Sequence, residues 1–168
     1  LLMGLEMYES SLCASGFPSV GQLPFPATQL ASAGANTLDD YEEGTFTPGI
    51  TFGGAAAGVT YVAQTGRYTK IGRQVLGWLR VELSSNGIST GSALLTGLPF
   101  TVNGKVGCQG LFDNMGTGTD VIPQFQLDDG TTTILCRQFN QTSGANSAIN
   151  ETDIPDTAVF LLSINYTV

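Results

Sequence analysis

Histidine is absent from this chain of 168 residues, and basic residues are scarce. Without histidine the chain lacks the usual general base near neutral pH, the Ser-His and Cys-His nucleophile pairs, and the commonest metal ligand. Lys and Arg number 6 against 14 Asp and Glu, which gives a formal net charge of −8 at pH 7. A chain of this charge repels the phosphates of DNA and RNA, so we expect no nucleic-acid partner.

Long apolar runs and metal-ligand patterns are missing as well. No segment approaches the length of about 20 apolar residues that a membrane-spanning helix needs, so we expect no membrane insertion. Cys13, Cys108 and Cys136 have no metal-ligand spacing and are expected to be buried free thiols. The oxygen-rich loop at residues 113–120 lacks the ligand order of a calcium loop, so we expect neither a metal ion nor a cofactor.

What the chain does contain is typical of a β-protein. Hydrophobic residues make up 42% and charged residues 12%, and there are 22 glycines. After residue 44, short apolar or alternating segments are separated by clusters of Gly, Asn, Asp and Pro. This pattern predicts an all-β fold, an antiparallel β-sandwich or jelly roll of about eight or nine strands. The expected strands are residues 45–52, 59–64, 67–83 (one strand, or two joined near Gly72), 92–95, 101–106, 108–113, 121–127, 131–139 and 158–168.

Alternation predicts which side of two strands faces the core. In one, Val75, Gly77, Leu79, Val81 and Leu83 share a face, opposite Gln74, Leu76, Trp78, Arg80 and Glu82; in the other, the shared face is Phe160, Leu162, Ile164, Tyr166 and Val168.

An acidic run divides the chain into two unlike parts. Asp39, Asp40, Glu42 and Glu43 lie within five positions, and residues 1–43 contain no Lys or Arg. We expect residues 1–43 to form an extended N-terminal arm that ends in an acidic hinge, and residues 44–168 to form the β-sandwich. The arm carries apolar side chains whose burial would be favourable, so it is predicted to pack against another subunit or another protein. A disordered arm is the alternative. Its interface candidates are Leu5, Phe17 and Phe25.

Four of the six basic residues lie close together, at Arg67, Lys70, Arg73 and Arg80. One hypothesis is that they meet the acidic run of the same or a neighbouring chain and so determine where the arm enters the domain. A solvated strand face is the alternative. Trp78 lies in the same segment and is expected in the sandwich core, although a subunit interface or a platform for a sugar ring also fits an aromatic side chain.

Carboxylate pairs are the remaining candidates for catalysis, as in glycosidases. The pairs are Asp39/Asp40, Asp113/Asp120, Asp128/Asp129 and Asp153/Asp156. Neighbouring residues on a strand point to opposite faces, so an adjacent pair is badly placed to share one site. We therefore predict that the chain is not an enzyme.

Several segments resemble one family. Residues 25–48, with Leu-Asp-Asp-Tyr-Glu-Glu-Gly-Thr at 38–45, are similar to a segment of tailed-bacteriophage virion proteins, especially tail fibres and related appendages, where it precedes a terminal β-domain. Further matches are Gln-Thr-Gly-Arg-Tyr-Thr-Lys-Ile-Gly-Arg at 64–73, Thr-Gly-Leu-Pro-Phe at 96–100 and Ile-Asn-Tyr-Thr-Val at 164–168.

The resemblance implies a virion structural protein, assembled in the cytoplasm of the bacterial host. The first expectation is a homotrimeric tail-fibre or receptor-binding domain, anchored to the particle by its arm. Its partners would be copies of itself, a tail or major capsid protein, and a host cell-surface glycan or protein. A capsid decoration (cement) or head-fibre protein that clamps the shell is the alternative, and a polysaccharide depolymerase is a distant third.

Overall fold

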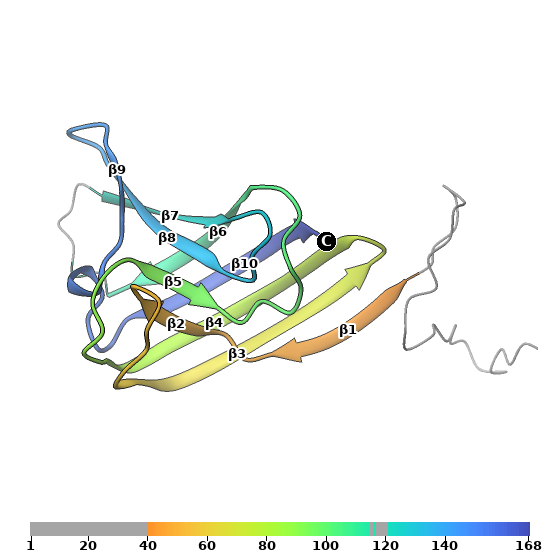
Figure 1. Cartoon of the computed structure of the whole chain (residues 1–168), viewed down its shortest axis with the longest axis horizontal. Coiled ribbons are helices and arrows are strands. Elements are labelled where there is room, and N and C mark those ends of the chain that lie inside the picture. The colour runs from red at the N-terminus through yellow and green to blue at the C-terminus, as the bar shows by residue number, and fades with distance from the viewer. Residues whose placement is uncertain (1–39, 115, 117–120) are drawn as a thin grey trace, which may run out of the picture.

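The computed structural model describes residues 40–114, 116 and 121–168. Ten strands and one short 3₁₀ turn, η1, are found in these residues (Figure 1). The elements are β1 (Tyr41–Phe46), β2 (Gly49–Phe52), β3 (Val59–Ile71), β4 (Gln74–Asn86), β5 (Ala93–Thr96), β6 (Val106–Asp113), β7 (Val121–Leu127), β8 (Ile134–Asn140), β9 (Asn146–Ala148), η1 (Glu151–Asp153) and β10 (Val159–Thr167).

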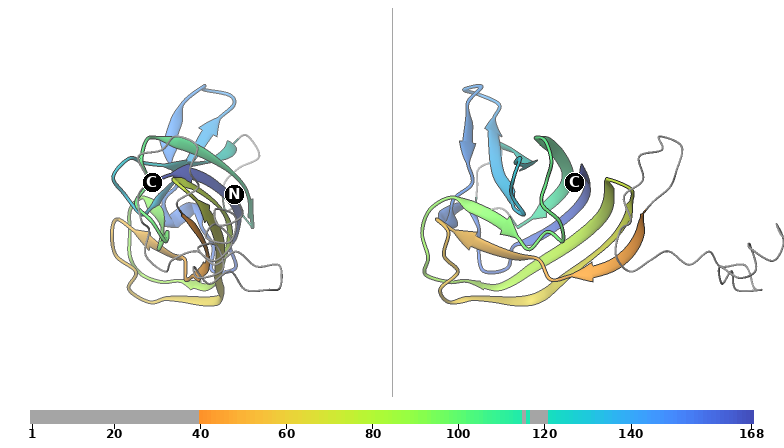
Figure 2. Two further views of the ribbon diagram at one scale, coloured as in Figure 1. Left: turned by 90° about the vertical axis from the view of Figure 1, so that its right-hand side faces the viewer. Right: turned by 45° about the vertical axis from the view of Figure 1, so that its right-hand side comes forward.

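The strands form one curled antiparallel sheet that closes over itself into two layers. The order along the sheet is β1-β3-β4-β10-β6-β7-β8-β5-β2, and β9 pairs with β8. We call β1, β3, β4, β10 and β6 the first layer, and β7, β8, β5 and β2 the second. Strand β6 joins them, because its residues 109–113 pair with β10 and its residues 106–108 pair with β7. Figure 2 shows the second layer folded over the first. The predicted all-β sandwich is confirmed.

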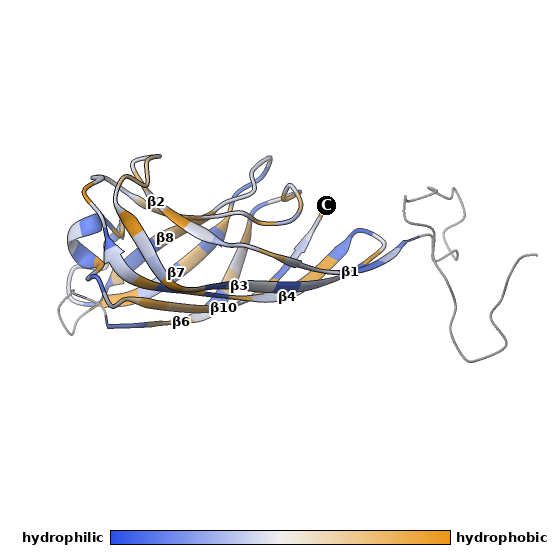
Figure 3. Ribbon diagram, turned by 90° about the horizontal axis from the view of Figure 1, so that it is seen from below, coloured by the Kyte–Doolittle hydropathy of each residue, from blue (hydrophilic) through white to orange (hydrophobic). Residues whose placement is uncertain are grey.

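The core lies between the layers and follows the predicted alternation. Val75, Leu79, Val81 and Leu83 of β4 are buried, and so are alternate residues of β10 from Phe160 to Tyr166. The ring of Phe160 stacks on that of Phe112 with centroids 4.3 Å apart. Each such buried side chain contributes about 1.5–3 kcal/mol. Colouring by hydropathy shows the alternation along the strands (Figure 3).

The expected first strand, residues 45–52, is wrong in two respects. Strand β1 begins earlier, at Tyr41, so Glu42 and Glu43 belong to a strand rather than to a hinge. The segment also divides at residues 47 and 48, and β2 belongs to the other layer. Pro48 explains the division, because it has no backbone N–H to continue a ladder. The arm expected at residues 1–43 lies outside the described residues, except for residues 40–43.

Three further expectations need correction. Strand β3 runs unbroken through Gly66, which is a glycine because the ring of Phe46 would lie 2.5 Å from an added Cβ. Residues 101–105 form a loop rather than a strand, since Gly104 turns the backbone at a φ of 86° and Asn103 makes only an isolated bridge to Thr167. Strand β9 lies in a segment expected to be a loop.

Gly77 lies against the backbone of the neighbouring strand and allows a stability prediction. A Cβ at this position would lie 2.5 Å from the backbone oxygen of Arg67 and 3.3 Å from a side-chain carbon of Ile164. Because the backbone cannot yield cheaply, we expect Gly77→Ala to lower the free energy of unfolding by about 1–3 kcal/mol. Chemical denaturation measures the change.

The matched control is Gly107→Ala on β6, where an added Cβ meets nothing nearer than 4.0 Å. We expect it to be neutral or stabilising, by up to about 1 kcal/mol, because alanine reduces the entropy of the unfolded chain. Equal losses in the two variants would contradict the packing argument.

Candidate functional site

The acidic run and the basic cluster meet at one point inside the described fold. The Lys70 ammonium on β3 contacts the Asp40 carboxylate just before β1, and both side chains are only 7% exposed. The ring of Phe100 lies against the Lys70 ammonium, with its centroid 5.6 Å from Lys70 Nζ. The backbone N–H of Gly72 also donates to the carbonyl of Asp40 at 2.9 Å. These contacts attach the start of β1 to the β3–β4 hairpin.

Two tyrosines, rather than bases, hold the next two carboxylates. The hydroxyl of Tyr68 donates to Glu42, and that of Tyr41 donates to Glu43. Burial, and then the bond to Glu42, raises the pKa of Tyr68 to about 12. The hydrogen bond to Glu43 is the main cause of the raised pKa of Tyr41. Phenols are protonated at neutral pH even without these shifts, so both tyrosines act as donors to the carboxylates of β1.

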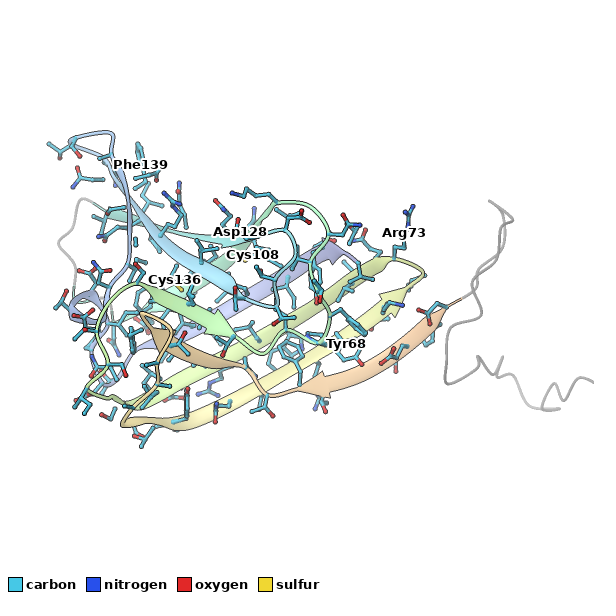
Figure 4. The ribbon with its side chains drawn as sticks, in the orientation of Figure 1. Tyr68, Arg73, Cys108, Asp128, Cys136 and Phe139 are labelled. Atoms are coloured by element: carbon cyan, nitrogen blue, oxygen red, sulfur yellow. The ribbon has the colours of Figure 1, made fainter. Side chains whose placement is uncertain are left out.

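The other candidates are not brought to the acidic run. Arg80 pairs with Glu82 on its own strand, β4. Arg67 and Arg73 make no ion pair with any described residue. Arg73 lies at the tip of the β3–β4 hairpin and points away from the sheet (Figure 4). Asp39, Leu5, Phe17 and Phe25 lie outside the described residues.

Trp78 is not in the core, which corrects the first expectation for it. The even-numbered residues of β4 point to solvent, and Trp78 is 45% exposed. Strand register places other exposed apolar side chains on the same side of the first layer. We call this surface the apolar face, and its members are Tyr41, Ile71, Leu76, Trp78, Leu111 and Leu161.

A shallow hollow of about 480 Å³ lies on the apolar face across β1, β3 and β4. Glu43, Arg67 and Trp78 line it together with hydroxyl and apolar side chains. Arg67 and Trp78 are cross-strand partners, and Thr45 is the partner of Arg67 on the other side. The hollow thus combines an aromatic ring with charges of both signs.

A second, larger hollow of about 840 Å³ lies over β6, β7 and β8 and is mostly polar. We call it the polar hollow. Its polar side chains are Lys105, Gln109, Gln124, Gln126, Arg137 and Asn146. A third hollow, between β10 and β6, shares Gln109 with the polar hollow and Leu76 with the first one. The sequence did not predict the polar hollow, because the residues that line it come from four separate segments of the chain.

Asp128 organises the rim of the polar hollow. Its carboxylate accepts from Lys105 Nζ at 3.0 Å and from Gln126 Nε2 at 2.7 Å. These two hydrogen bonds hold the pKa of Asp128 below its usual value, and the bond from Lys105 is the larger cause. Asp128 therefore stays ionised and is a poor proton donor for a glycosidase-type pair.

The described residues offer little other chemistry. They contain no group of three or more Cys, Asp or Glu side chains that could hold a metal ion. Cys136 is a buried free thiol, as predicted, while Cys108 is half-buried; burial raises the pKa of each thiol to about 12, so neither is reactive at neutral pH. Cys13 lies outside the described residues. Within the described part of the chain, no helix is long and apolar enough to span a membrane.

Comparison with known proteins gives a likeness at the level of the fold. The sequence matches no family model and no curated protein. The crystal structure of the Dettilon tailspike protein is similar to this chain, with a TM-score of 0.62 and 17% sequence identity. The match covers 76% of this chain but 23% of that one, so this chain spans about a quarter of the length of the tailspike. At this level of identity, the β-sandwich described above is what the two proteins share.

Proposed function

We propose that this chain is a bacteriophage virion structural protein, a tail-fibre or tailspike domain that attaches to the host surface. The observation that carries the proposal is the fold likeness to a tailspike protein over 76% of the chain. The segments that resemble phage tail-fibre proteins, at residues 25–48 and 64–73, point to the same class independently of the fold. Residues 1–43 would anchor the domain to the rest of the particle.

The proposed domain is a homotrimer, and the apolar face supports self-association. Six of the nine large hydrophobic side chains that are exposed in the described residues lie on this one face. The charges beside them are mixed, with Arg67 and Arg80 against Glu43, Glu82 and Asp113. On a chain of net charge −8, a nearly neutral apolar face is the surface where copies repel each other least.

Within this proposal the domain binds and does not catalyse. Asp128 is tied to Lys105 and Gln126, and its lowered pKa suits a fixed charge better than a proton donor. Attachment would therefore depend on several weak contacts made together by the copies in one appendage.

Adsorption of the phage to its host tests the attachment role. We expect the purified chain to compete with phage for host cells and to reduce the adsorption rate as its concentration rises. The expected concentration for half inhibition is lower for the associated form than for a monomeric variant, because linked sites bind with avidity. The fraction of unadsorbed phage, measured by plaque counts, gives the result.

Two further measurements separate the alternatives. Hundreds of copies per particle, without competition for adsorption, would replace this proposal with a capsid decoration protein. Release of reducing sugar from host polysaccharide by the purified chain would instead indicate a depolymerase.

A further inference from the structure

We infer that the polar hollow binds an acidic saccharide, with Arg137 facing the sugar carboxylate. This inference rests on the proposed function and adds to it the chemical class of the receptor and the place where it binds. The hollow has a volume of about 840 Å³, within the range of about 300–1,000 Å³ for small-molecule sites.

Arg137 is the first reason. It lies on β8, half-buried, and makes no ion pair with any described carboxylate, although its charge helps to lower the pKa of Asp128 nearby. An unpaired, partly desolvated guanidinium attracts an anion strongly, and its planar fork matches a carboxylate with two parallel hydrogen bonds. Only six basic residues exist in the chain, and two of them, Arg137 and Lys105, line this hollow. Lys105 is paired with Asp128, so Arg137 is the one that can face a ligand anion. The arrangement favours an anionic group on the ligand.

The amide side chains are the second reason. Gln109, Gln124 and Asn146 are exposed, and their side chains make no hydrogen bond within the described fold. Each carboxamide offers both a donor and an acceptor, which is what a sugar hydroxyl requires. Gln124 is the cross-strand partner of Arg137, so a carboxylate and a neighbouring hydroxyl could be bound side by side. A ligand rich in hydroxyl groups therefore fits better than an apolar one.

The rim and the floor of the polar hollow are held in place by contacts within the fold, without a ligand. Asp128 holds Lys105 and Gln126 in place, which leaves the carbonyl oxygen of the Gln126 side chain available as an acceptor. Gly107, the partner of Gln126 on β6, has no side chain to fill the floor. From β6 to β8 the site is on the order of 10 Å wide, enough for a sugar ring lying across β7.

The position of the hollow agrees with its proposed use. Three of its six polar side chains, Gln124, Gln126 and Arg137, lie on β7 and β8 of the second layer, whereas Gln109 lies on β6 at the edge of the apolar face. Association centred on Trp78 would leave the part of the polar hollow formed by β7 and β8 open to solvent on each copy. Several identical weak sites on one appendage would then act together on a repetitive glycan.

Titration of the full chain with acidic oligosaccharides tests the inference. The probes are short oligomers of galacturonate, glucuronate and sialic acid, and the same oligomers with their carboxyl groups reduced to alcohols. We expect at least one acidic probe to bind, the reduced form to bind at least about tenfold more weakly, and Arg137→Gln to cause a similar loss. Arg73→Gln is the matched control, since it removes the same charge from the hairpin tip and should bind like the wild type.

Running adsorption competition on the same variants keeps the two proposals distinguishable. If the wild type blocks adsorption but no acidic probe binds, or if Arg137→Gln binds and competes as the wild type does, the saccharide site is wrong and the attachment role stands. Equal binding of the acidic and the reduced probes would show that Arg137 does not bind a sugar carboxylate. If the wild type does not compete at all, the proposed function fails, and the inference that rests on it fails too. An unchanged unfolding midpoint of Arg137→Gln would show that the variant is folded.

Discussion

Lys70→Ala should lower the free energy of unfolding by about 3–5 kcal/mol, because it leaves the buried Asp40 carboxylate without its counter-charge. Both side chains are 7% exposed, and the ring of Phe100 covers Lys70, so water cannot easily replace the lost ammonium. The loss should be greatest at β1, whose amide hydrogens at residues 41–46 should exchange faster than those of β4. Denaturant unfolding and hydrogen exchange measure the two effects.

Lys105→Ala is the control for this prediction. It removes a lysine from an ion pair with Asp128 whose lysine side chain is 65% exposed, and we expect a cost of at most about 1 kcal/mol. The double variant Lys70→Met with Asp40→Leu removes both buried charges and should recover most of the stability that Lys70→Ala loses. A Lys70→Ala cost no larger than that of Lys105→Ala would show that the Asp40 carboxylate does not need its buried partner.

Trp78→Glu combined with Leu161→Glu should convert the proposed trimer into monomers. Both side chains lie on the apolar face, and a charge buried in the centre of a self-contact is opposed by desolvation and by the same charge on the other copies. We expect the association constant to fall by at least about a hundredfold, as the loss of two central interface side chains typically causes. Sedimentation equilibrium of the full chain gives the mass and the constant.

Ile122→Glu makes the matched comparison, since Ile122 is exposed to a similar degree but lies on β7, away from the apolar face. This variant should associate like the wild type, and the circular dichroism of all variants should be unchanged, because the replaced side chains face solvent within one copy. Trimers that survive Trp78→Glu with Leu161→Glu would place the self-contact elsewhere. A wild-type chain that is monomeric at every concentration would remove the homotrimer from the proposal.

The position of Trp78 shows how well strand alternation predicts the face of a strand on which a side chain lies. The pattern correctly separated Val75, Leu79, Val81 and Leu83 from the even-numbered residues of β4. The same alternation placed Trp78 on the polar side of β4, whereas the separate expectation for an aromatic side chain placed it in the core. Alternation was the better guide here, because the pleat of a strand leaves a residue no way to change face without a bulge. The one irregular region of the β3–β4 pair lies between Thr60 and Ala63, well away from Trp78.

The acidic run shows a mixed case: the hypothesis that the basic cluster meets it is confirmed for Lys70 and Asp40, but the expected hinge at residues 41–43 is wrong. Four carboxylates within five positions favoured a solvated hinge, because like charges repel. In the fold, Lys70 and Tyr68 on the next strand of the sheet provide partners for Asp40 and Glu42. Those partners are 30 and 26 positions away, so the stability of β1 depends on pairing that no local window of sequence contains.

By itself, the sequence determined the all-β class, the position of most strands and the inward face of the long ones, because these follow from a two-residue period and from glycine and proline at the turns. Only the tertiary structure decided the order of the strands along the sheet, the contact between Asp40 and Lys70, the apolar face around Trp78, and the gathering of Gln124, Arg137 and Gln109 around one hollow. The physical reason is that strand order and register are set by which apolar faces bury each other across the core, so they depend on pairs of segments far apart in the chain.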